Sequence, residues 1–362
     1  MHGKSSQEKY LLKPHYPCLT ACFFLDQRLN FGGRLSRRPV TWIITINYRT
    51  ADLVIESLRA LDSQKEALGG GQVVIIDNDS GDGSSEKIAS TINSEGWGTW
   101  SSIVPMSHNG GFAFGNNIGF SKAFSSAGQV DYLMLLNPDS VVRQGAIKNL
   151  ITFMDEHPKA GIAGSRLENE DGDIECSAHK FHSPLSELLA GARLGFLDQV
   201  LSNYEVTPPL RDEAHLCDWV SGSSMIIRRK VIEEIGLMDE GFFLYFEEVD
   251  FFQRAAKAGW QTWYVPESIV MHIEGASTGI KSTKRRPSYW YNSRRRYFVK
   301  HYGILGLILA DLLWSIGRLT FFIRRFLRLG AQGVLRDPEH YSFDLLWGDV
   351  KAILTRKVLK IH

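Results

Sequence analysis

The sequence has few cysteines, no excess of charge of either sign and no internal repeat. Its four cysteines form no Cys-x-x-Cys pair and no zinc-like spacing with histidine, which excludes a disulfide framework and a zinc finger. Unpaired buried thiols in a reducing compartment are expected instead. Because 41 basic residues balance 40 acidic ones, the overall charge provides no attraction to nucleic acid.

Two common phosphate-binding patterns are also missing. The segment from Asn109 to Gly119 contains four glycines and three asparagines, but it has neither the G-x-G-x-x-G spacing nor a Walker lysine. This argues against dinucleotide cofactors and P-loop chemistry. Backbone amides of such a segment can approach a phosphate or a sugar closely, and a plain turn with a helix start is the alternative.

Hydrophobic runs predict an α/β fold. Thr41 to Ile46, Val73 to Ile76 and Tyr132 to Leu136 are typical of short buried strands separated by helices. Such an alternation predicts a mainly parallel sheet covered on both faces. Further helices are expected over about 145–156 and 246–258. Ligands of these sheets bind beyond the carboxyl ends of the strands, so polar residues at those ends are site candidates.

Carboxylates follow two of these strands. Asp77, with Asp79 close by, stands where it can accept the imide N–H of uracil or thymine, and a turn or helix cap is the alternative role. Asp139 follows the third strand and the turn-forming Pro138, where a hard cation can bridge it to a diphosphate. A turn aspartate is again the alternative.

Three acids, Glu247, Glu248 and Asp250, stand among aromatic residues at a predicted helix start. Partial burial would raise the pKa of a carboxyl there toward the range of a general base, and a solvated helix start is the ordinary alternative. Helical spacing puts Glu247 and Asp250 on one face and Glu248 elsewhere. His272 follows a strand expected over 262–265. It is a candidate ligand, and a core histidine is the simpler interpretation when the residue is taken alone.

Taken in order, these segments resemble the family 2 inverting glycosyltransferases, most closely the rhamnosyltransferase-like branch of bacterial cell-surface polysaccharide synthesis. The resemblance covers about Val40 to Tyr302 and implies the GT-A fold, a Rossmann-like α/β architecture. It is carried by seven motifs in family order: Ile46-Asn47-Tyr48, Ile76 to Ser80, Asn109 to Gly119, Leu136 to Asp139, Trp219 to Ser223, Phe246 to Asp250, and His272.

The resemblance also implies roles for single residues. Those that would bind the nucleotide-sugar are Asn47, Tyr48, Asp77, Asp79, Asn109, Gly111, Asn116, Asn117 and Asp139. Those that would face the acceptor are Trp219, Gly222 and Ser223. A divalent cation, Mg²⁺ or Mn²⁺, would bind Asp139 and His272. The catalytic group would be Glu248, as the base, with Glu247 and Asp250.

Two positions depart from the family pattern. Many relatives carry Glu-Asp where this chain has Glu247-Glu248, so the base is assigned to Glu248 while Glu247 stays open as the alternative. Asn137 replaces the first acid of the metal motif, which leaves one carboxylate there and lowers the expected metal affinity.

The implied reaction is inverting transfer of a sugar from a dTDP- or UDP-linked donor to a hydroxyl of a saccharide or lipid-linked glycan. Rhamnose from dTDP-rhamnose is the leading expectation. The alternatives are a catalytically silent glycan-binding or scaffold protein at the membrane, and a sugar nucleotidyltransferase. The latter should need a glycine-rich loop on its first strand, and the segment Trp42 to Thr50 lacks one.

Three parts are expected along the chain. Residues 1–38 form an N-terminal extension without a clean signal peptide. Residues 39–300 form the GT-A domain, with a nucleotide-binding half over 39–145 and an acceptor-binding half over 146–300. Residues 301–362 form an amphipathic helical region that associates with a membrane.

This last part is predicted from charge and periodicity. Residues 281–296 hold seven basic side chains and no acid, and apolar positions from Leu305 to Phe326 fall on one helical face. The apolar stretch is shorter than the ~20 residues of a membrane span, and Asp311 would be costly near its centre. A peripheral helix on the cytoplasmic face of the bacterial inner membrane is expected, with a span or a buried or dimer helix as alternatives. A homo-oligomer is left open and no nucleic-acid partner is expected.

Overall fold

The computed structural model describes residues 37–126, 128–273, 284–327, 337–356 and 358. The predicted N-terminal extension therefore lies almost entirely outside the described residues, as does Lys281 of the basic segment. Residues from Arg38 onward belong to one unit, and the fold below is that of this unit.

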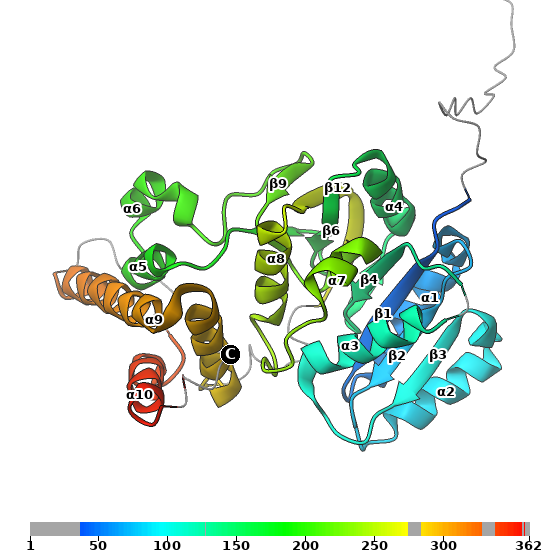
Figure 1. Ribbon diagram of the computed structural model, residues 1–362, viewed down its shortest axis with the longest axis horizontal. Coiled ribbons are helices and arrows are strands. Elements are labelled where there is room, and N and C mark those ends of the chain that lie inside the picture. The colour runs from blue at the N-terminus through cyan, green and yellow to red at the C-terminus, as the bar shows by residue number, and fades with distance from the viewer. Residues whose placement is uncertain (1–36, 127, 274–283, 328–336, 357, 359–362) are drawn as a thin grey trace, which may run out of the picture. The chain divides into compact units, whose positions relative to one another are not determined.

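Four parallel strands form one half of a central sheet (Figure 1). In spatial order they are β3 (Ser101–Pro105), β2 (Val73–Asp77), β1 (Thr41–Asn47) and β4 (Tyr132–Leu136). β1, β2 and β4 are buried along their whole length. Ile43 packs on one face toward α1 (Ala51–Asp62), while its neighbour Ile44 packs on the other toward α3 (Gly111–Phe124), so helices cover both faces.

The other half of the sheet is mixed. Its members are β5 (Ser140–Val142), β6 (Ala160–Glu168), β7 (Ile174–Glu175), β9 (His215–Cys217), β11 (Ser224–Arg228) and β12 (Gln261–His272). β11 runs antiparallel between β4 and β6, and β12 runs parallel to β6. A separate ribbon pairs β8 (Ala178–His179) with β10 (Trp219–Val220). The predicted α/β fold with a mainly parallel sheet is confirmed, with β11 as an antiparallel member.

Besides α1 and α3, the helices that flank the sheet are α2 (Ser84–Ser94), α4 (Ala146–Glu156), α7 (Arg229–Ile235) and α8 (Glu247–Lys257). Four more interrupt or follow the sheet along the chain, namely α5 (Pro184–Ala192), α6 (Gly195–Val200), α9 (Ser288–Phe326) and α10 (Tyr341–Leu354). Short 3₁₀ turns η1, η2 and η3 cover Lys65–Leu68, Trp97–Thr99 and Ser202–Tyr204. The helices expected over 145–156 and 246–258 are thus present within one residue of the predicted ends.

β12 is much longer than the strand predicted over 262–265. The register against β6 shifts between Val265 and Ile269, around Pro266, which has no backbone N–H to donate. The strand then resumes and pairs antiparallel with β5, where His272 lies opposite Ser140. This extension brings His272 to the end of β4, which a proline within an apolar run does not predict.

α9 consists of two helical segments that meet at Gly303, where φ is 71°. The second segment packs on α5 with close backbone contact. A Cβ added to Gly317 would lie 2.4 Å from the backbone oxygen of Leu188, and one added to Gly191 would lie 2.5 Å from that of Trp314. Only glycine fits at either position in this arrangement.

A buried ion cluster joins the C-terminal helices. Arg294, in the first segment of α9, is 1% exposed. Its guanidinium lies 2.9, 3.0 and 3.0 Å from carboxylates on three other parts of the structure, namely Glu187 of α5, Asp311 of the second segment of α9 and Asp349 of α10. Arg295 pairs with Asp349 as well. These two residues of the basic segment are therefore used inside the protein, although the sequence predicts them for a membrane surface.

Candidate active site

The carboxyl ends of β1 and β2 are joined by buried side chains. Asn47 Nδ2 donates to Asp77 Oδ1 at 2.6 Å and to Ser80 Oγ at 3.1 Å. Asn47 Oδ1 accepts from the backbone N–H of Thr50, which fixes the start of α1. Within the described residues Asp77 Oδ2 accepts only a long hydrogen bond of 3.4 Å, from Ser80. This oxygen retains capacity for a further donor, such as a base N–H.

Tyr48 and Asp79 lie at the surface beside this network. The Tyr48 side chain is exposed, and Asp79 has a positive φ of 59°. Arg49 also has a positive φ, of 60°, and its guanidinium lies 5.1 Å from the centre of the Tyr48 ring. An exposed ring with a cation on it is a surface on which a flat base can stack. No role was predicted for Arg49, because a single surface arginine carries no signal in the sequence.

The start of α3 contacts two other parts of the site. Asn78 Nδ2 donates to Asn109 Oδ1 at 2.9 Å and to Gly111 O at 3.0 Å, which ties this helix to the end of β2. Gly111 has a φ of 88°, and a Cβ there would lie 2.0 Å from the backbone oxygen of Phe243. The glycine thus permits contact with the loop that leads into α8.

Asn116 and Asn117 lie inside α3 and differ in what they contact. The Asn117 amide donates to Met238 O and Glu240 Oε1 and accepts from Met238 N, so it holds the loop before α8. Asn116 Nδ2 donates to Phe112 O, whereas its Oδ1 is buried with no hydrogen-bond partner among the described residues. Asn117 therefore has a structural role, and its contact with a nucleotide stays a prediction.

Ser223 joins the end of β4 to the end of β12. Its backbone oxygen accepts from Asn137 N at 2.9 Å and from Ser140 Oγ at 3.3 Å. Its Oγ lies 3.2 Å from His272 Nε2, and the same nitrogen lies 3.5 Å from Asp139 Oδ1. Asp139 and His272 are both buried. The two side chains predicted to bind a metal are therefore neighbours.

A second carboxylate lies on the other side of His272. His272 Nδ1 is 3.8 Å from Glu175 Oε2, and this nitrogen has no hydrogen-bond partner in the described part of the chain. The described residues contain no group of three His, Cys, Asp or Glu side chains that could hold a metal alone. Asp139 and His272 fit a cation whose remaining ligands are phosphate oxygens. Glu175 was not predicted, because a two-residue strand leaves no pattern in the sequence.

The loop from Trp219 to Ser223 runs along the site. The Trp219 ring stacks on His179 with centroids 4.2 Å apart. A Cβ added to Gly222 would lie 3.6 Å from Cζ of Phe112, in α3. The three residues predicted to face the acceptor thus extend from an aromatic cluster past α3 to the Asp139–His272 pair.

A strained turn begins α8. Tyr245 and Phe246 have positive φ angles of 69° and 68°, which bulky residues rarely adopt. Each such residue costs about 1–3 kcal/mol and persists only where packing holds it. The buried Phe246 ring lies 4.9 Å from the His182 ring and 5.6 Å from the Tyr297 ring. Packing of the Phe246 ring thus holds the turn from which the first carboxylates of α8 project.

Glu247 and Glu248 stand at this turn with raised pKa values. Glu247 is 2% exposed and Glu248 is half-buried. Burial raises the pKa of both, and the charge of Glu248 raises the pKa of Glu247 further. One oxygen of each, Oε2, is buried with no hydrogen-bond partner within the described ranges. Two adjacent carboxyls with raised pKa retain a proton between them and provide a strong base when one ionises.

Asp250 is in a different environment one turn along α8. His301 Nε2 and Lys300 Nζ each lie 2.8 Å from Asp250 Oδ1, and Arg254 Nε donates to Oδ2 at 3.0 Å. Burial alone would raise the pKa of Asp250, but hydrogen bonds from His301 and Lys300 and the charge of Arg254 lower it. A carboxylate with a low pKa is a weak base. Asp250 thus joins α8 to Lys300 and His301 of α9, and its catalytic role stays a prediction.

Contacts along one edge of the sheet join these parts. Phe112 N donates to Phe243 O at 2.9 Å, which connects α3 to the loop before Glu247. Gly222 lies against the same Phe112, and its neighbour Ser223 contacts His272. The strand ends, the start of α3 and the start of α8 thus form a continuous site.

Comparisons with known proteins identify the family and the fold. The family model described as glycosyl transferase family group 2 matches residues 132–347. N-acetylglucosaminyl-diphospho-decaprenol L-rhamnosyltransferase of Mycobacterium tuberculosis is 29% identical over 188 residues, which cover 49% of this chain and 60% of that protein. Rhamnosyltransferase WbbL of Escherichia coli K12 is 25% identical over 165 residues, which cover 45% of this chain and 60% of that protein. The chain thus spans 60% of the length of each of these relatives.

A solved structure shows the same fold. GalNAc-T7 with UDP, GalNAc and Mn²⁺ is similar with a TM-score of 0.51 and 14% sequence identity, covering 88% of this chain and 57% of that one. The predicted GT-A fold is confirmed by this likeness and by the family match.

Proposed function

The chain belongs to glycosyl transferase family group 2 and is a glycosyltransferase, and from this premise we propose that it transfers rhamnose from dTDP-rhamnose to a hydroxyl of a lipid-linked saccharide in cell-surface polysaccharide synthesis. Similarity to two proteins named as rhamnosyltransferases supports the choice of sugar. The observation that carries the proposal is the carboxylate pair Glu247–Glu248. The pKa of each carboxyl is raised, and the pair lies in the same continuous site as Asp139 and His272.

The nucleotide is proposed to bind over the ends of β1 and β2. Asp77 Oδ2 accepts the imide N–H of the base, while Asn47 keeps the Asp77 carboxylate in place. The exposed Tyr48 ring stacks on the base, and Asp79 lies at the rim near the ribose. Gly111 N donates to Asn109 Oδ1, and this start of α3 is proposed to lie beside the sugar and the phosphates.

Glu248 is proposed to act as the general base. Its carboxylate takes the proton of the acceptor hydroxyl while that oxygen attacks the anomeric carbon. The new C–O bond forms as the bond to the nucleoside diphosphate breaks, the diphosphate leaves with the electron pair, and the configuration inverts. Burial supports this role, because a raised pKa makes the ionised carboxylate a stronger base. Glu247 retains the neighbouring proton and is the alternative base.

Asp139 and His272 are proposed to hold a divalent cation, Mg²⁺ or Mn²⁺. When bound, this ion neutralises the charge that develops on the departing diphosphate. Asp139 contributes a carboxylate oxygen and His272 an imidazole nitrogen. Ser223 Oγ lies 3.2 Å from His272 Nε2, the nitrogen nearest Asp139, and would give up this hydrogen bond to the ion. Because the described residues bring no third His, Cys, Asp or Glu into a metal-binding group, the affinity for the ion depends on the oxygens of the bound donor.

The acceptor is proposed to reach the site from the cytoplasmic face of a membrane, with the protein bound peripherally. By length and composition α9 can also cross a membrane. However, 39% of its most apolar stretch is buried inside the protein, which favours docking on the membrane surface. Its exposed large apolar residues are Leu305, Ile308, Leu309, Leu312, Ile316, Leu319, Phe322, Ile323 and Phe326. We term these residues, together with the exposed Phe343, Trp347, Val350 and Leu354 of α10, the apolar helix face.

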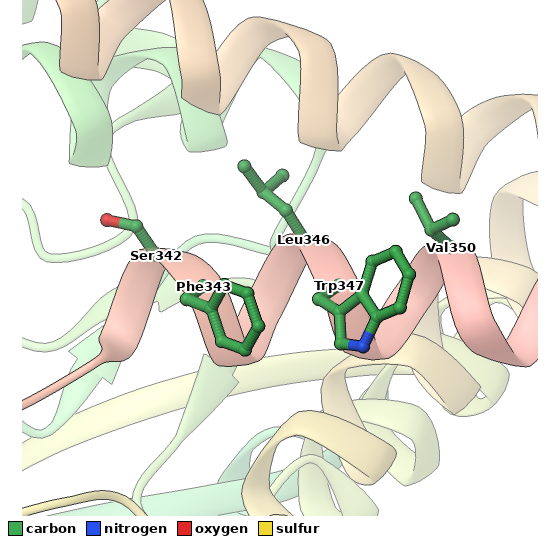
Figure 2. Close-up of a pocket in the computed structure, with 5 residues that line it drawn as sticks. All are labelled: Ser342, Phe343, Leu346, Trp347 and Val350. Carbon is green, nitrogen blue, oxygen red and sulfur yellow. The ribbon is translucent and has the colours of Figure 1, made fainter.

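The charges on these two helices suit an anionic leaflet. α9 and α10 contain three acids, Asp311, Asp344 and Asp349, and each is paired with an arginine. Figure 2 shows a hollow along α10 that is lined by Ser342, Phe343, Leu346, Trp347 and Val350 and carries no acidic side chain. A large exposed apolar patch on a protein surface marks an interaction site. An interfacial membrane contact uses such a patch with cations around it.

A panel of nucleotide-sugars tests the proposal. The full chain is incubated with dTDP-rhamnose, UDP-glucose, UDP-N-acetylglucosamine and GDP-mannose, each with Mg²⁺ or Mn²⁺ and with a lipid-linked saccharide. Release of dTDP, with incorporation of rhamnose into the acceptor and little turnover of the other donors, is expected. Preferential turnover of another donor would change the assigned sugar. Metal-independent binding of glycans without any turnover would instead indicate a catalytically silent member.

A further inference from the structure

Arg286 lies over the ring of Trp290, which contacts the residue before α8 and the first residue of α10, and we propose that its guanidinium binds the diphosphate of the lipid-linked acceptor. The inference rests on the function proposed above, which makes a lipid-linked saccharide the acceptor. It concerns a separate group of residues, at the start of α9, and assigns them to a chemical part of the acceptor that the reaction itself does not alter.

Neighbouring basic residues form ion pairs with carboxylates, whereas Arg286 forms none within the described residues. Arg285 Nε donates to Asp344 Oδ2 at 2.7 Å. Arg294 and Arg295 belong to the buried ion cluster. Arg286 is half-buried, makes no ion pair within the described residues, and has a buried Nε–H with no acceptor there. A guanidinium withdrawn from water without an anionic partner is costly, and a bound anion removes that cost.

A second donor stands beside this guanidinium. The Tyr291 hydroxyl is buried and has no hydrogen-bond partner in the part of the chain that the structure describes. Burial and the charge of Asp344, opposed by the charges of Arg286 and Arg285, together raise the pKa of Tyr291 to about 12. The Asp344 carboxylate is the one acid among them, and Arg285 neutralises it.

A diphosphate satisfies this arrangement better than a carboxylate of the protein does. Its several oxygens can accept from the planar guanidinium and from a hydroxyl at the same time. The guanidinium carbon of Arg286 lies 4.8 Å from the centre of the Trp290 ring, so the cation has a fixed plane on which to present its N–H groups. The site is thus prepared for a planar, bidentate contact with phosphate oxygens.

The position of Trp290 gives the site its direction. Its ring lies 5.9 Å from Phe246, which immediately precedes Glu247, and 5.7 Å from Tyr341, the first residue of α10. Arg286 therefore lies against a ring that connects the residue before Glu247 to the first residue of α10. A saccharide joined to a lipid through a diphosphate has the same order of groups: sugar, anion, apolar chain. The relative from Mycobacterium tuberculosis is named for a substrate of that order.

The diphosphate of the nucleotide donor has the same chemistry and is the other possible source of the anion. The lipid is favoured because Arg286 lies over Trp290, whose ring is 5.7 Å from Tyr341 at the start of α10. The nucleotide candidates Asn47 and Asp77 lie at the ends of β1 and β2. The two sources are separated by measuring the binding of each one alone.

The test measures binding by the full chain of farnesyl diphosphate, farnesol and dTDP with Mg²⁺, using tryptophan fluorescence and calorimetry below the micelle concentration. Wild type is compared with Arg286→Gln, Arg286→Lys and the matched surface control Lys284→Gln. Arg286→Gln is expected to weaken farnesyl diphosphate roughly tenfold or more, the worth of a charge-assisted bidentate contact, with dTDP and farnesol unchanged. Arg286→Lys retains part of the affinity, and Lys284→Gln retains all of it.

Three outcomes overturn the assignment. They are unchanged binding of farnesyl diphosphate by Arg286→Gln, an equal or larger loss for dTDP, and an equal loss for farnesol. Thermal unfolding verifies that each variant is folded. If Arg286→Gln does not fold, the comparison of wild type with Arg286→Lys decides the test. Because binding is measured without turnover, Arg286-dependent binding by a chain that transfers no sugar would contradict the proposed function and leave this inference standing.

Discussion

His272 Nε2 lies 3.5 Å from Asp139 Oδ1, and the ring is held there by Ser223 Oγ at 3.2 Å. The contact joins the end of β12 to the turn after β4. It depends on the part of β12 that resumes beyond Pro266 and pairs with β5. The carboxylate and the imidazole that are proposed to bind the metal are thereby brought to the edge of the sheet where the donor diphosphate is proposed to bind.

The first prediction concerns this pair. Replacing His272 by Asn removes the imidazole, so the Mn²⁺ concentration that gives half-maximal dTDP binding should rise about tenfold or more, as for lost metal-site interactions. Glu170→Gln serves as the control, because Glu170 is exposed, whereas Glu175 faces the other ring nitrogen of His272 at 3.8 Å and would support the ligand. Calorimetry with dTDP over a series of Mn²⁺ concentrations measures the effect. An equal rise in both variants would mean that His272 does not bind the ion.

The second prediction uses the raised pKa of Glu247. The folded chain binds this proton more tightly than the unfolded chain, whose carboxyl has a pKa near 4.5. The contribution of Glu247 to stability is therefore fully present below pH 4.5 and is lost as the pH rises through the folded pKa. Glu247→Gln, which cannot ionise, should gain stability relative to wild type as the pH rises from 4.5 to 8. Urea unfolding at several pH values measures this, and a pH-independent difference would contradict it.

The third prediction concerns Asp250, whose pKa is lowered by its cationic neighbours. Asp250→Asn leaves Arg254 and His301 without this carboxylate and leaves Lys300 paired with Asp239 alone, and it should cost up to about 3–5 kcal/mol at pH 7. The sign is the reverse of that for Glu247. Stability from Asp250 is present above its usual pKa of 3.8 and is lost as the pH falls through the lowered value. The deficit of the variant should therefore shrink below pH 3.8.

A surface pair provides the control for that experiment. Glu233 pairs with Arg229 at 2.7 Å, and its side chain is half-exposed. Glu233→Gln should cost no more than about 1 kcal/mol, because solvent screens exposed pairs. A similar cost for both substitutions would show that Asp250 does not anchor α8 to α9.

The fourth prediction concerns the packing of α5 on α9. Gly317→Ala places a methyl group 2.4 Å from the backbone oxygen of Leu188, so the helices must separate. A loss of about 1–3 kcal/mol in the free energy of unfolding is expected from overpacking. Gly98→Ala is the control, since nothing lies within 4 Å of a Cβ there. Urea denaturation compares the two, and equal stability would contradict the close helix contact.

The fifth prediction concerns the apolar helix face. Leu312→Glu and Trp347→Glu should each reduce sedimentation of the full chain with vesicles of phosphatidylglycerol and phosphatidylcholine, because a charge opposes insertion at the interface. The control is Leu216→Glu, in β9, whose side chain is as exposed as those two but lies outside this face. If all three variants sediment like wild type, the face does not bind anionic bilayers.

The strand ends were predictable because local patterns specify them. A buried apolar run followed by Asp77 or by Pro138-Asp139 predicts both the strand and the turn, and the structure has both. Helix starts were predicted within one residue for the same reason. The acidic start of α8 was predicted as a partly buried group, but its division into a high-pKa pair and a low-pKa Asp250 was not, because His301 and Lys300 come from α9.

The remaining features depend on partners far away in the sequence. Arg294 and Arg295 appear in a run of basic residues, which by itself predicts a surface, yet their carboxylates come from α5 and α10. The antiparallel position of β11 depends on how the chain returns between β4 and β6. Glu175 reaches His272 only because β12 continues past Pro266. Neither composition nor periodicity specifies such pairings.

The most direct test of the central claim is the turnover of dTDP-rhamnose by Glu248→Gln with a lipid-linked saccharide acceptor, with dTDP binding measured on the same protein. Loss of the general base should lower kcat by about 10²- to 10⁴-fold while the affinity for dTDP stays unchanged. Asp139→Ala should lose the metal-dependent part of dTDP binding as well as turnover. Near-normal turnover in both variants would contradict the proposed mechanism.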